Sequence, residues 1–175
     1  MKVIAFAATN STTSINKQLV SYAVSLLGNV EVELLDLNDY EMPLYSEDRE
    51  KATGHPELAK QFLNKLNDAD AIIISFAEHN GSYSVAYKNV FDWCSRIQHK
   101  VYQGKPMVLL ATSPGAGGAQ SVLAAANGSM PYFGAEVKAS LSVPNFFDNF
   151  DTENQRMINP EWDDRLHSAM QQLLA

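Results

Sequence analysis

The sequence predicts an α/β domain, a three-layer sandwich in which helices cover both faces of a five-stranded parallel sheet. Apolar runs of strand length alternate with helical patterns along the whole of the 175 residues, and this alternation is typical of parallel sheets with crossover helices. Three of the runs are almost entirely apolar, as expected of central strands that are buried on both faces. A chain of this length fits one core, so we expect a single domain over residues 1–175.

The individual elements follow from these patterns. The expected strands are, in chain order, Val3–Ala7, Val30–Leu37, Ala71–Phe76, Met107–Ala111 and Val137–Val143. The expected helices are Ile15–Leu27, Pro56–Asn67, Val85–Ile97, Gly118–Phe133 and Pro160–Leu174. In the last helix apolar residues recur at helical spacing from Trp162 to Leu173, which predicts one buried face.

The order of the strands follows from their polarity. In the second strand Val30, Val32 and Leu34 alternate with polar residues, and the fifth strand alternates in the same way, which places both strands at the edges of the sheet. The order 2-1-3-4-5 satisfies this condition and is allowed by right-handed crossovers. It is the flavodoxin-like order, in which a ligand crevice opens where strands one and three diverge.

Composition excludes several classes of protein. The net charge of −7 argues against a nucleic-acid partner, which requires a basic stripe. No apolar run approaches the roughly 20 residues that span a bilayer. The apolar N-terminus is interpreted as a strand and not as a signal peptide, so we expect a cytoplasmic protein. The lone Cys94 excludes an internal disulfide and a cysteine-rich metal site; we expect it to be buried in a helix.

Three loops should meet above the carboxyl ends of strands one, three and four. The first loop, residues 8–16, brings hydroxyl side chains and backbone N–H groups to the start of a helix, an arrangement that favours an anion. It contains no Lys, Arg or Gly, which excludes the phosphate-binding and dinucleotide-binding glycine motifs. Neutral donors fit the terminal phosphate of a mononucleotide, and simple helix capping is the alternative.

The other two loops have the composition of sites for a flat ring. In the second loop, residues 77–84, Asn80 and Gly81 suit a tight turn whose backbone could approach a ring. His79 is interpreted as a hydrogen-bonding residue. The third loop, residues 112–118, has three glycines before a helix, so that successive N–H groups could face a polar ring edge. A purely structural turn is the alternative for each loop.

These loops resemble those of the NADPH-dependent FMN reductase family, which includes bacterial quinone, chromate and azo-dye reductases. The family carries G-S-x-R-x-x-S-x-N after strand one, P-E-Y-N-x-S-x-P-G-x-L-K-N-x-x-D-W after strand three and S-x-G-x-x-G-G after strand four. The matching stretches here are residues 77–82, 88–93 and 113–118, with further matches at 104–106, at 42–45 and at Asp48. The resemblance covers nearly the whole chain.

The resemblance implies that FMN is bound by all three loops. The implied cofactor-binding residues are Thr9, Ser11, Ser14, Ile15 and Asn16 near the phosphate, and Glu78, His79, Asn80, Gly81, Ser82, Ser113, Pro114, Gly115, Gly117 and Gly118 around the isoalloxazine ring. Four positions depart from the family pattern: Ala8 replaces Gly, Ser11 replaces the phosphate-contacting Arg, His79 replaces Tyr, and Ser84-Val85 replaces Pro-Gly.

The activity implied by the resemblance is that of an FMN-dependent NAD(P)H oxidoreductase. Hydride would pass from NADPH or NADH to flavin N5 and then to a small-molecule acceptor such as a quinone or free flavin, without a catalytic side chain. The resemblance also implies a homodimer or tetramer, with Tyr45 and Asp48 near the neighbouring site. Two alternatives remain open: a flavodoxin-type electron carrier, and a flavin-free domain that keeps the fold with a decayed site.

Overall fold

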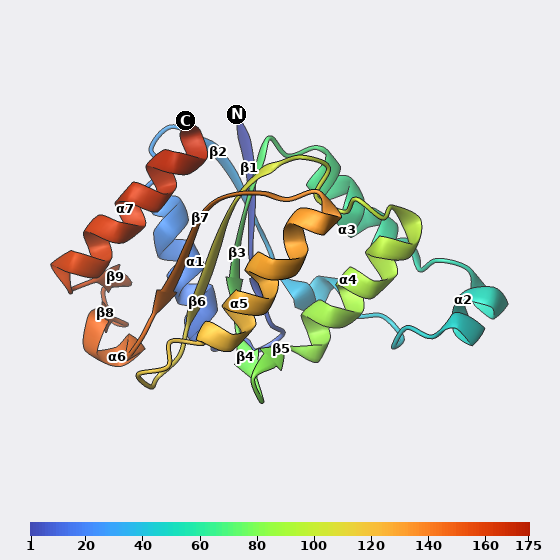
Figure 1. The fold of residues 1–175 in the computed structure, drawn as a ribbon, viewed down its shortest axis with the longest axis horizontal. Helices are drawn as coiled ribbons and strands as arrows, with labels where there is room; N and C mark the ends of the chain where they lie inside the picture. The colour runs from blue at the N-terminus through green and yellow to red at the C-terminus, as the bar shows by residue number, and fades with distance from the viewer.

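The computed structural model describes residues 1–175 and contains a five-stranded parallel sheet with the order β2-β1-β3-β6-β7. The strands are β1 (Lys2–Ala8), β2 (Glu31–Leu35), β3 (Ala71–Phe76), β6 (Pro106–Thr112) and β7 (Glu136–Val143). Among these five strands the order is the predicted 2-1-3-4-5, so the flavodoxin-like α/β fold class is confirmed. All five strands end at the same edge, which lies at the bottom of Figure 1 beside the hairpin of β4 (Glu78–His79) and β5 (Ser82–Tyr83).

Helices cover both faces of the sheet (Figure 1). One face is covered by α1 (Ile15–Ser25) and α7 (Pro160–Leu174), the other by α3 (Glu57–Asn67), α4 (Val85–Ile97) and α5 (Gln120–Ser129). Each face has its own apolar cluster. Alternate residues of a central strand enter different clusters: Ile4 of β1 packs on the α3–α4 side and Val3 on the α1–α7 side, because side chains alternate along a strand. This explains why the central strands are apolar throughout.

The two alternating strands lie at the edges, as predicted. In β2 the burial pattern differs in detail from the expectation, because Leu34 is 50% exposed and Leu35 is buried. The strand ends at Leu35, two residues earlier than predicted. Glu33 faces α3 and is held by Lys2 and Lys65 at 3.1 and 2.5 Å, which lower the pKa of its carboxyl group mainly through the hydrogen bond from Lys65.

Several short elements interrupt the regular alternation. The predicted helix 118–133 is divided into α5 and a 3-10 turn, η2 (Met130–Phe133), where Pro131 cannot continue the α-helical hydrogen bonds. The remaining short elements are η1 (Leu37–Tyr40), α2 (Glu47–Thr53), β4 (Glu78–His79), β5 (Ser82–Tyr83), α6 (Phe146–Asn149), β8 (Phe150–Asp151) and β9 (Arg156–Met157). These elements are too short for an apolar repeat to predict them from the sequence.

The single cysteine is part of the core. Cys94 on α4 is fully buried, and burial raises the pKa of its thiol to about 12. The side chain is therefore a small apolar packing group and not a reactive thiolate. No helix has both the length and the apolar character needed to span a bilayer.

Candidate active site

The first and second loops are joined by a buried hydroxyl group. Ser84 is the N-cap of α4, where its Oγ accepts a hydrogen bond from the Tyr87 N–H at 3.2 Å. The same hydroxyl donates to the carbonyl oxygen of Ala8 at 2.7 Å, at the end of β1. Because Ser84 is 1% exposed, this bond is protected from water and fixes the start of α4 against the first loop.

The first loop is joined to the other two central strands by Asn16. Its Oδ1 accepts from the Ser75 hydroxyl of β3 at 2.8 Å and from the Thr112 N–H of β6 at 3.1 Å, and its Nδ2 donates to the Thr112 carbonyl at 3.2 Å. The side chain is 3% exposed. The Asn16 amide therefore serves to join the first loop to β3 and β6, and its contact with the phosphate stays a prediction.

A third link joins the second loop to α5. The carboxylate of Glu78 accepts from the Val122 N–H at 2.9 Å, in the first turn of that helix. A carboxylate at a helix N-terminus satisfies a free N–H group and interacts favourably with the helix dipole. Glu78 thus caps α5 through Oε2. Its backbone and its other carboxylate oxygen would be the groups that make the predicted contact with a ring.

With these links in place, the first loop leaves a row of free donors. The N–H groups of residues 10 and 12–15 make no hydrogen bond within the chain. Thr9 Oγ1 accepts from the Ser11 N–H at 3.1 Å, and Ser14 Oγ caps α1 through the Asn16 N–H at 3.2 Å. Ser11 is exposed, and Ile15 is the half-buried first residue of α1. Free N–H groups beside hydroxyl groups form a suitable site for an anion.

Charge distribution supports the same interpretation. The helices that start at the ends of the three central strands, α1, α4 and α5, have no acidic residue in the first turn. By contrast α2, α3, α6 and α7 each carry at least one carboxylate there. The partial positive charge at the N-termini of α1 and α4 is therefore not neutralised by their own side chains, whereas that of α5 is met by Glu78.

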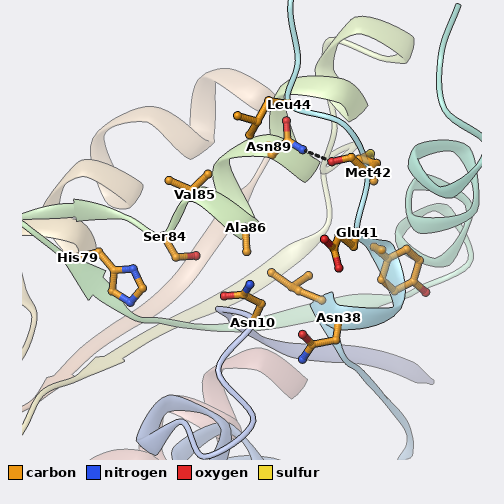
Figure 2. Close-up of a pocket in the computed structure, with 12 residues that line it drawn as sticks. Asn10, Asn38, Glu41, Met42, Leu44, His79, Ser84, Val85, Ala86 and Asn89 are labelled. Atoms are coloured by element: carbon orange, nitrogen blue, oxygen red, sulfur yellow. Dashed lines mark hydrogen bonds between the residues drawn. The ribbon is translucent and has the colours of Figure 1, made fainter. Parts of the chain in front are cut away.

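The second loop is a two-residue hairpin between β4 and β5. Asn80 and Gly81 have φ angles of 53° and 76°, the positive values that a type I′ turn requires at both central positions. His79 pairs with Ser82 across the hairpin, and both are exposed. Figure 2 shows the His79 ring lying at one side of a pocket. The predicted tight turn is confirmed, and the hairpin presents these residues to solvent at the sheet edge.

The third loop also carries free donors. The N–H groups of Gly115, Ala116 and Gly117 are unpaired, whereas the carbonyl groups of Ser113 and Gly115 accept from the Phe146 and Asn145 N–H groups at 3.1 and 3.0 Å. The Ser113 hydroxyl donates to the Gly115 carbonyl at 3.1 Å. The carbonyl groups therefore face the protein and leave successive N–H groups free. Pro114 is exposed beside them.

Gly118 does not line this donor row. A Cβ atom at this position would lie 2.3 Å from Ser142 Oγ and 3.2 Å from the Pro144 nitrogen, and its φ is +59°. Gly118 is buried against the end of β7. Glycine is needed here for close packing and for a left-handed backbone, and the contact of Gly118 with a ring stays a prediction.

A cavity of about 330 Å³ opens beside the first two loops (Figure 2). It is lined by Asn10, Leu37, Asn38, Tyr40, Glu41, Met42, Leu44, His79, Ser84, Val85, Ala86 and Asn89. Of the predicted cofactor-binding residues, only His79 lies in this wall. Glu41 is the only Asp or Glu among the lining residues, and no Lys or Arg lines the cavity. The resemblance implied that the segment Met42–Asp48 lies near the site of a neighbouring subunit, but it did not imply that residues 37–44 line a cavity in their own chain.

The segment that forms this wall is fixed by α4. Asn89 donates from Nδ2 to the carbonyl groups of Met42 and Pro43 at 3.1 and 3.2 Å, and its Oδ1 accepts from the Tyr45 N–H at 2.8 Å. Trp93 Nε1 donates to the same Pro43 carbonyl at 2.8 Å. The match at residues 42–45 and 88–93 was the sequence signal for this contact, but the hydrogen bonds that join the two stretches required the structure.

Comparison with known proteins identifies the family to which this site belongs. Residues 1–148 match the family described as NADPH-dependent FMN reductase. The chain belongs to the NADPH-dependent FMN reductase family. Membership confirms the resemblance stated from the loops, and with it FMN as the cofactor and a nicotinamide dinucleotide as the electron donor.

Individual relatives agree with this assignment. An NAD(P)H-dependent FMN reductase of Pseudomonas aeruginosa is 31% identical, with 66% of this chain and 61% of the relative covered. A 2-hydroxy-1,4-benzoquinone reductase of a Burkholderia species is 36% identical over 59% of this chain and 55% of the relative. The flavoenzyme NAD(P)H:(acceptor) oxidoreductase FerB from Paracoccus denitrificans shares the fold, with a TM-score of 0.82, 21% identity and coverage of 98% and 94%. The chain therefore spans under two thirds of the length of the two named reductases.

The donors of this family member fit FMN. A phosphate needs N–H and hydroxyl donors near a positive helix end, which the first loop provides with its free N–H groups. The polar edge of an isoalloxazine ring carries carbonyl oxygens and ring nitrogens, which can accept from the free N–H groups of residues 115–117. Thr9, Ser11, Ser14 and the first-loop backbone would hold the phosphate, and the hairpin and the glycine loop would border the ring.

Proposed function

We propose that this protein is an FMN-dependent NAD(P)H oxidoreductase that reduces a quinone, a free flavin or a similar small molecule. The main support is the pair of free N–H rows, at residues 12–15 and 115–117, on loops that buried hydrogen bonds join to one another. Such a rigid frame would hold a cofactor in one orientation. The quinone acceptor is suggested by the printed name of the Burkholderia relative.

Bound FMN would supply the hydride chemistry, since flavins accept hydride from nicotinamides. The chain's own residues would bind the phosphate, orient the ring and leave one ring face open. The cavity beside the loops has an apolar rim in which Leu44 and Val85 are 61% and 67% exposed. An apolar rim of this kind suits the flat ring of an acceptor.

Purified protein is expected to bind FMN and to oxidise NADH or NADPH with a quinone as acceptor. Because donor and acceptor would use the same ring face in turn, double-reciprocal plots should be parallel, the pattern of ping-pong kinetics. Intersecting lines would contradict the shared face. Protein that binds FMN but is not bleached by either nicotinamide would indicate the electron carrier. Protein that takes up no FMN would indicate a flavin-free domain.

A homodimer or a dimer of dimers is also part of this proposal. The seven-residue helix α2 has no buried residue and projects from the body of the protein at the far right of Figure 1. A helix this short is not stable by itself. Tyr45 binds Glu50 through its hydroxyl at 3.0 Å within its own chain, so Asp48, which is exposed on α2, is the better candidate to approach a neighbouring site.

Light scattering is expected to show a dimer or tetramer. Leu44 precedes Tyr45 and is 61% exposed, so we expect it to lie in the proposed contact between subunits. Leu44→Glu would place a charge in this contact and should shift the population toward the monomer. Leu34→Glu is the matched control, since Leu34 is 50% exposed on the edge strand β2, away from α2. A monomeric wild-type protein with full activity, or dissociation by the control and not by Leu44→Glu, would contradict this arrangement.

Two broader expectations are retained as proposals. We propose that residues 1–175 act as one domain, because both apolar clusters are built on the same sheet. A cytoplasmic location is supported by the single, buried and unpaired cysteine, which suits a reducing compartment.

A further inference from the structure

The phosphate position in this chain lacks the cation that the family pattern provides. Ser11 stands where the family has Arg and can offer only a neutral hydroxyl. The three loops, residues 8–16, 77–84 and 112–118, contain no Lys or Arg at all. A phosphate that is close to doubly charged at neutral pH is bound more strongly when a cation is among its donors. A replacement charge would have to come from outside the loops.

Lys17 is a cation that lines the same hollow as Ser11. It is the third residue of α1, and side chains in a helix point back toward the N-terminus, here toward the first loop. The residues that line a small hollow together with Lys17 are Ala7, Thr9, Ser11, Leu35, Asp36 and Leu37. Two of the five hydroxyl residues of the first loop, Thr9 and Ser11, therefore line the hollow together with Lys17.

The surroundings of Lys17 are unusual for a lysine. A cation in the first turn of a helix is disfavoured by the helix dipole. Asp36, at the end of β2, compensates by binding the ammonium group at 2.5 Å. This hydrogen bond is the largest contribution that lowers the pKa of the Asp36 carboxyl group, followed by the hydrogen bond from the Asn38 N–H.

This ion pair is accessible to a ligand. The side chains of Lys17 and Asp36 are 45% and 33% exposed, and exposed pairs of this kind contribute little to stability. An ammonium group has three donors, so Lys17 can bind Asp36 and a phosphate oxygen at the same time. The other partner of Asp36 is the neutral Asn38, so no second cation competes for the carboxylate.

We propose that Lys17 supplies the positive charge for the FMN phosphate in place of the family arginine, and that Asp36 positions Lys17 while weakening its attraction for the phosphate. The inference rests on the proposed function, because it assigns a residue to the phosphate subsite of that cofactor. In this arrangement the positive charge at the phosphate comes from Lys17 of α1, and Asp36, which follows β2, modifies it. The first loop alone does not supply this charge.

The test is a comparison of FMN with riboflavin, which lacks the phosphate, by quenching of flavin fluorescence on binding. Lys17→Met should weaken FMN binding about tenfold, the loss expected for one charge-assisted hydrogen bond, and leave riboflavin unchanged. It should also reduce the salt dependence of FMN binding. Asp36→Asn should tighten FMN binding severalfold without affecting riboflavin. Adding Ser11→Arg to Lys17→Met should restore FMN affinity.

Lys88→Met is the control, because it removes the same charge from a lysine paired with an aspartate, Asp92, on α4. Circular dichroism checks that each variant is folded. Equal loss of FMN and riboflavin in Lys17→Met, an equal effect of Lys88→Met, or unchanged FMN affinity would overturn the role of Lys17. Wild-type protein that binds neither flavin would reject the proposed function itself, whereas wild-type protein that binds both equally would reject only the phosphate subsite.

Discussion

Replacing Asn16 with alanine is expected to lower the free energy of unfolding by roughly 3–5 kcal/mol, because each buried polar group left without a partner costs about 1–3 kcal/mol. The substitution removes the partner of the Ser75 hydroxyl and of both backbone groups of Thr112. Urea denaturation followed by circular dichroism measures the change. Since Asn16 joins the first loop to β3 and β6, binding of both FMN and riboflavin should weaken.

Asn10→Ala provides the matched control for this prediction. Asn10 is an exposed asparagine of the same loop and lines the cavity, and its side chain makes no hydrogen bond in the structure. Its replacement should change stability by less than about 0.5 kcal/mol, as is usual for surface positions. An Asn16→Ala protein that is as stable as the Asn10→Ala protein would show that Asn16 does not hold the loops together.

Gly118→Ala should destabilise the fold by roughly 2–4 kcal/mol, the sum of a left-handed backbone cost and overpacking. The new Cβ would lie 2.3 Å from Ser142 Oγ and 3.2 Å from the Pro144 nitrogen. The Ser142 hydroxyl would have to leave its hydrogen bond to the Gly118 carbonyl, now 2.7 Å long. The thermal midpoint and the urea midpoint measure the change.

Gly117→Ala is the control for this glycine. An added Cβ at Gly117 meets nothing within 4 Å, and the residue does not have a positive φ. Its substitution should therefore be nearly neutral. Combining Gly118→Ala with Ser142→Ala should recover part of the loss, because the closest clash disappears. Equal stability of the two single glycine variants would refute the packing explanation.

Local patterns predicted the elements that have long periodic sequences. β3, α4 and α7 begin and end at the predicted residues. A strand buried on both faces is a continuous apolar run, and an amphipathic helix has an apolar repeat over several turns, so both can be recognised in the sequence. The strand order was also predictable, since only strands with a solvated face alternate. Shorter elements such as α2 and the β8–β9 hairpin have no such repeat.

The candidate site was predicted as loops and not as side-chain contacts. Asn16 and Glu78 have the residue types of ligand contacts, and the family motif contains both. In the structure they bind other parts of the chain: Asn16 reaches residues 59 and 96 positions away, and Glu78 one 44 positions away. Hydrogen bonds across such separations have no signal in local periodicity, so the direction of these side chains could not be predicted.

By itself the sequence determined the α/β class, the strand order, the three loops at the carboxyl edge and the family. These properties depend on short-range polarity patterns and on motif spacing, which a linear chain displays directly. Only the tertiary structure decided that Asn16, Ser84 and Glu78 join the loops, that residues 37–44 form a cavity wall, and that Lys17 shares a hollow with Ser11. Each of these depends on which strands become neighbours and how their ends pack together.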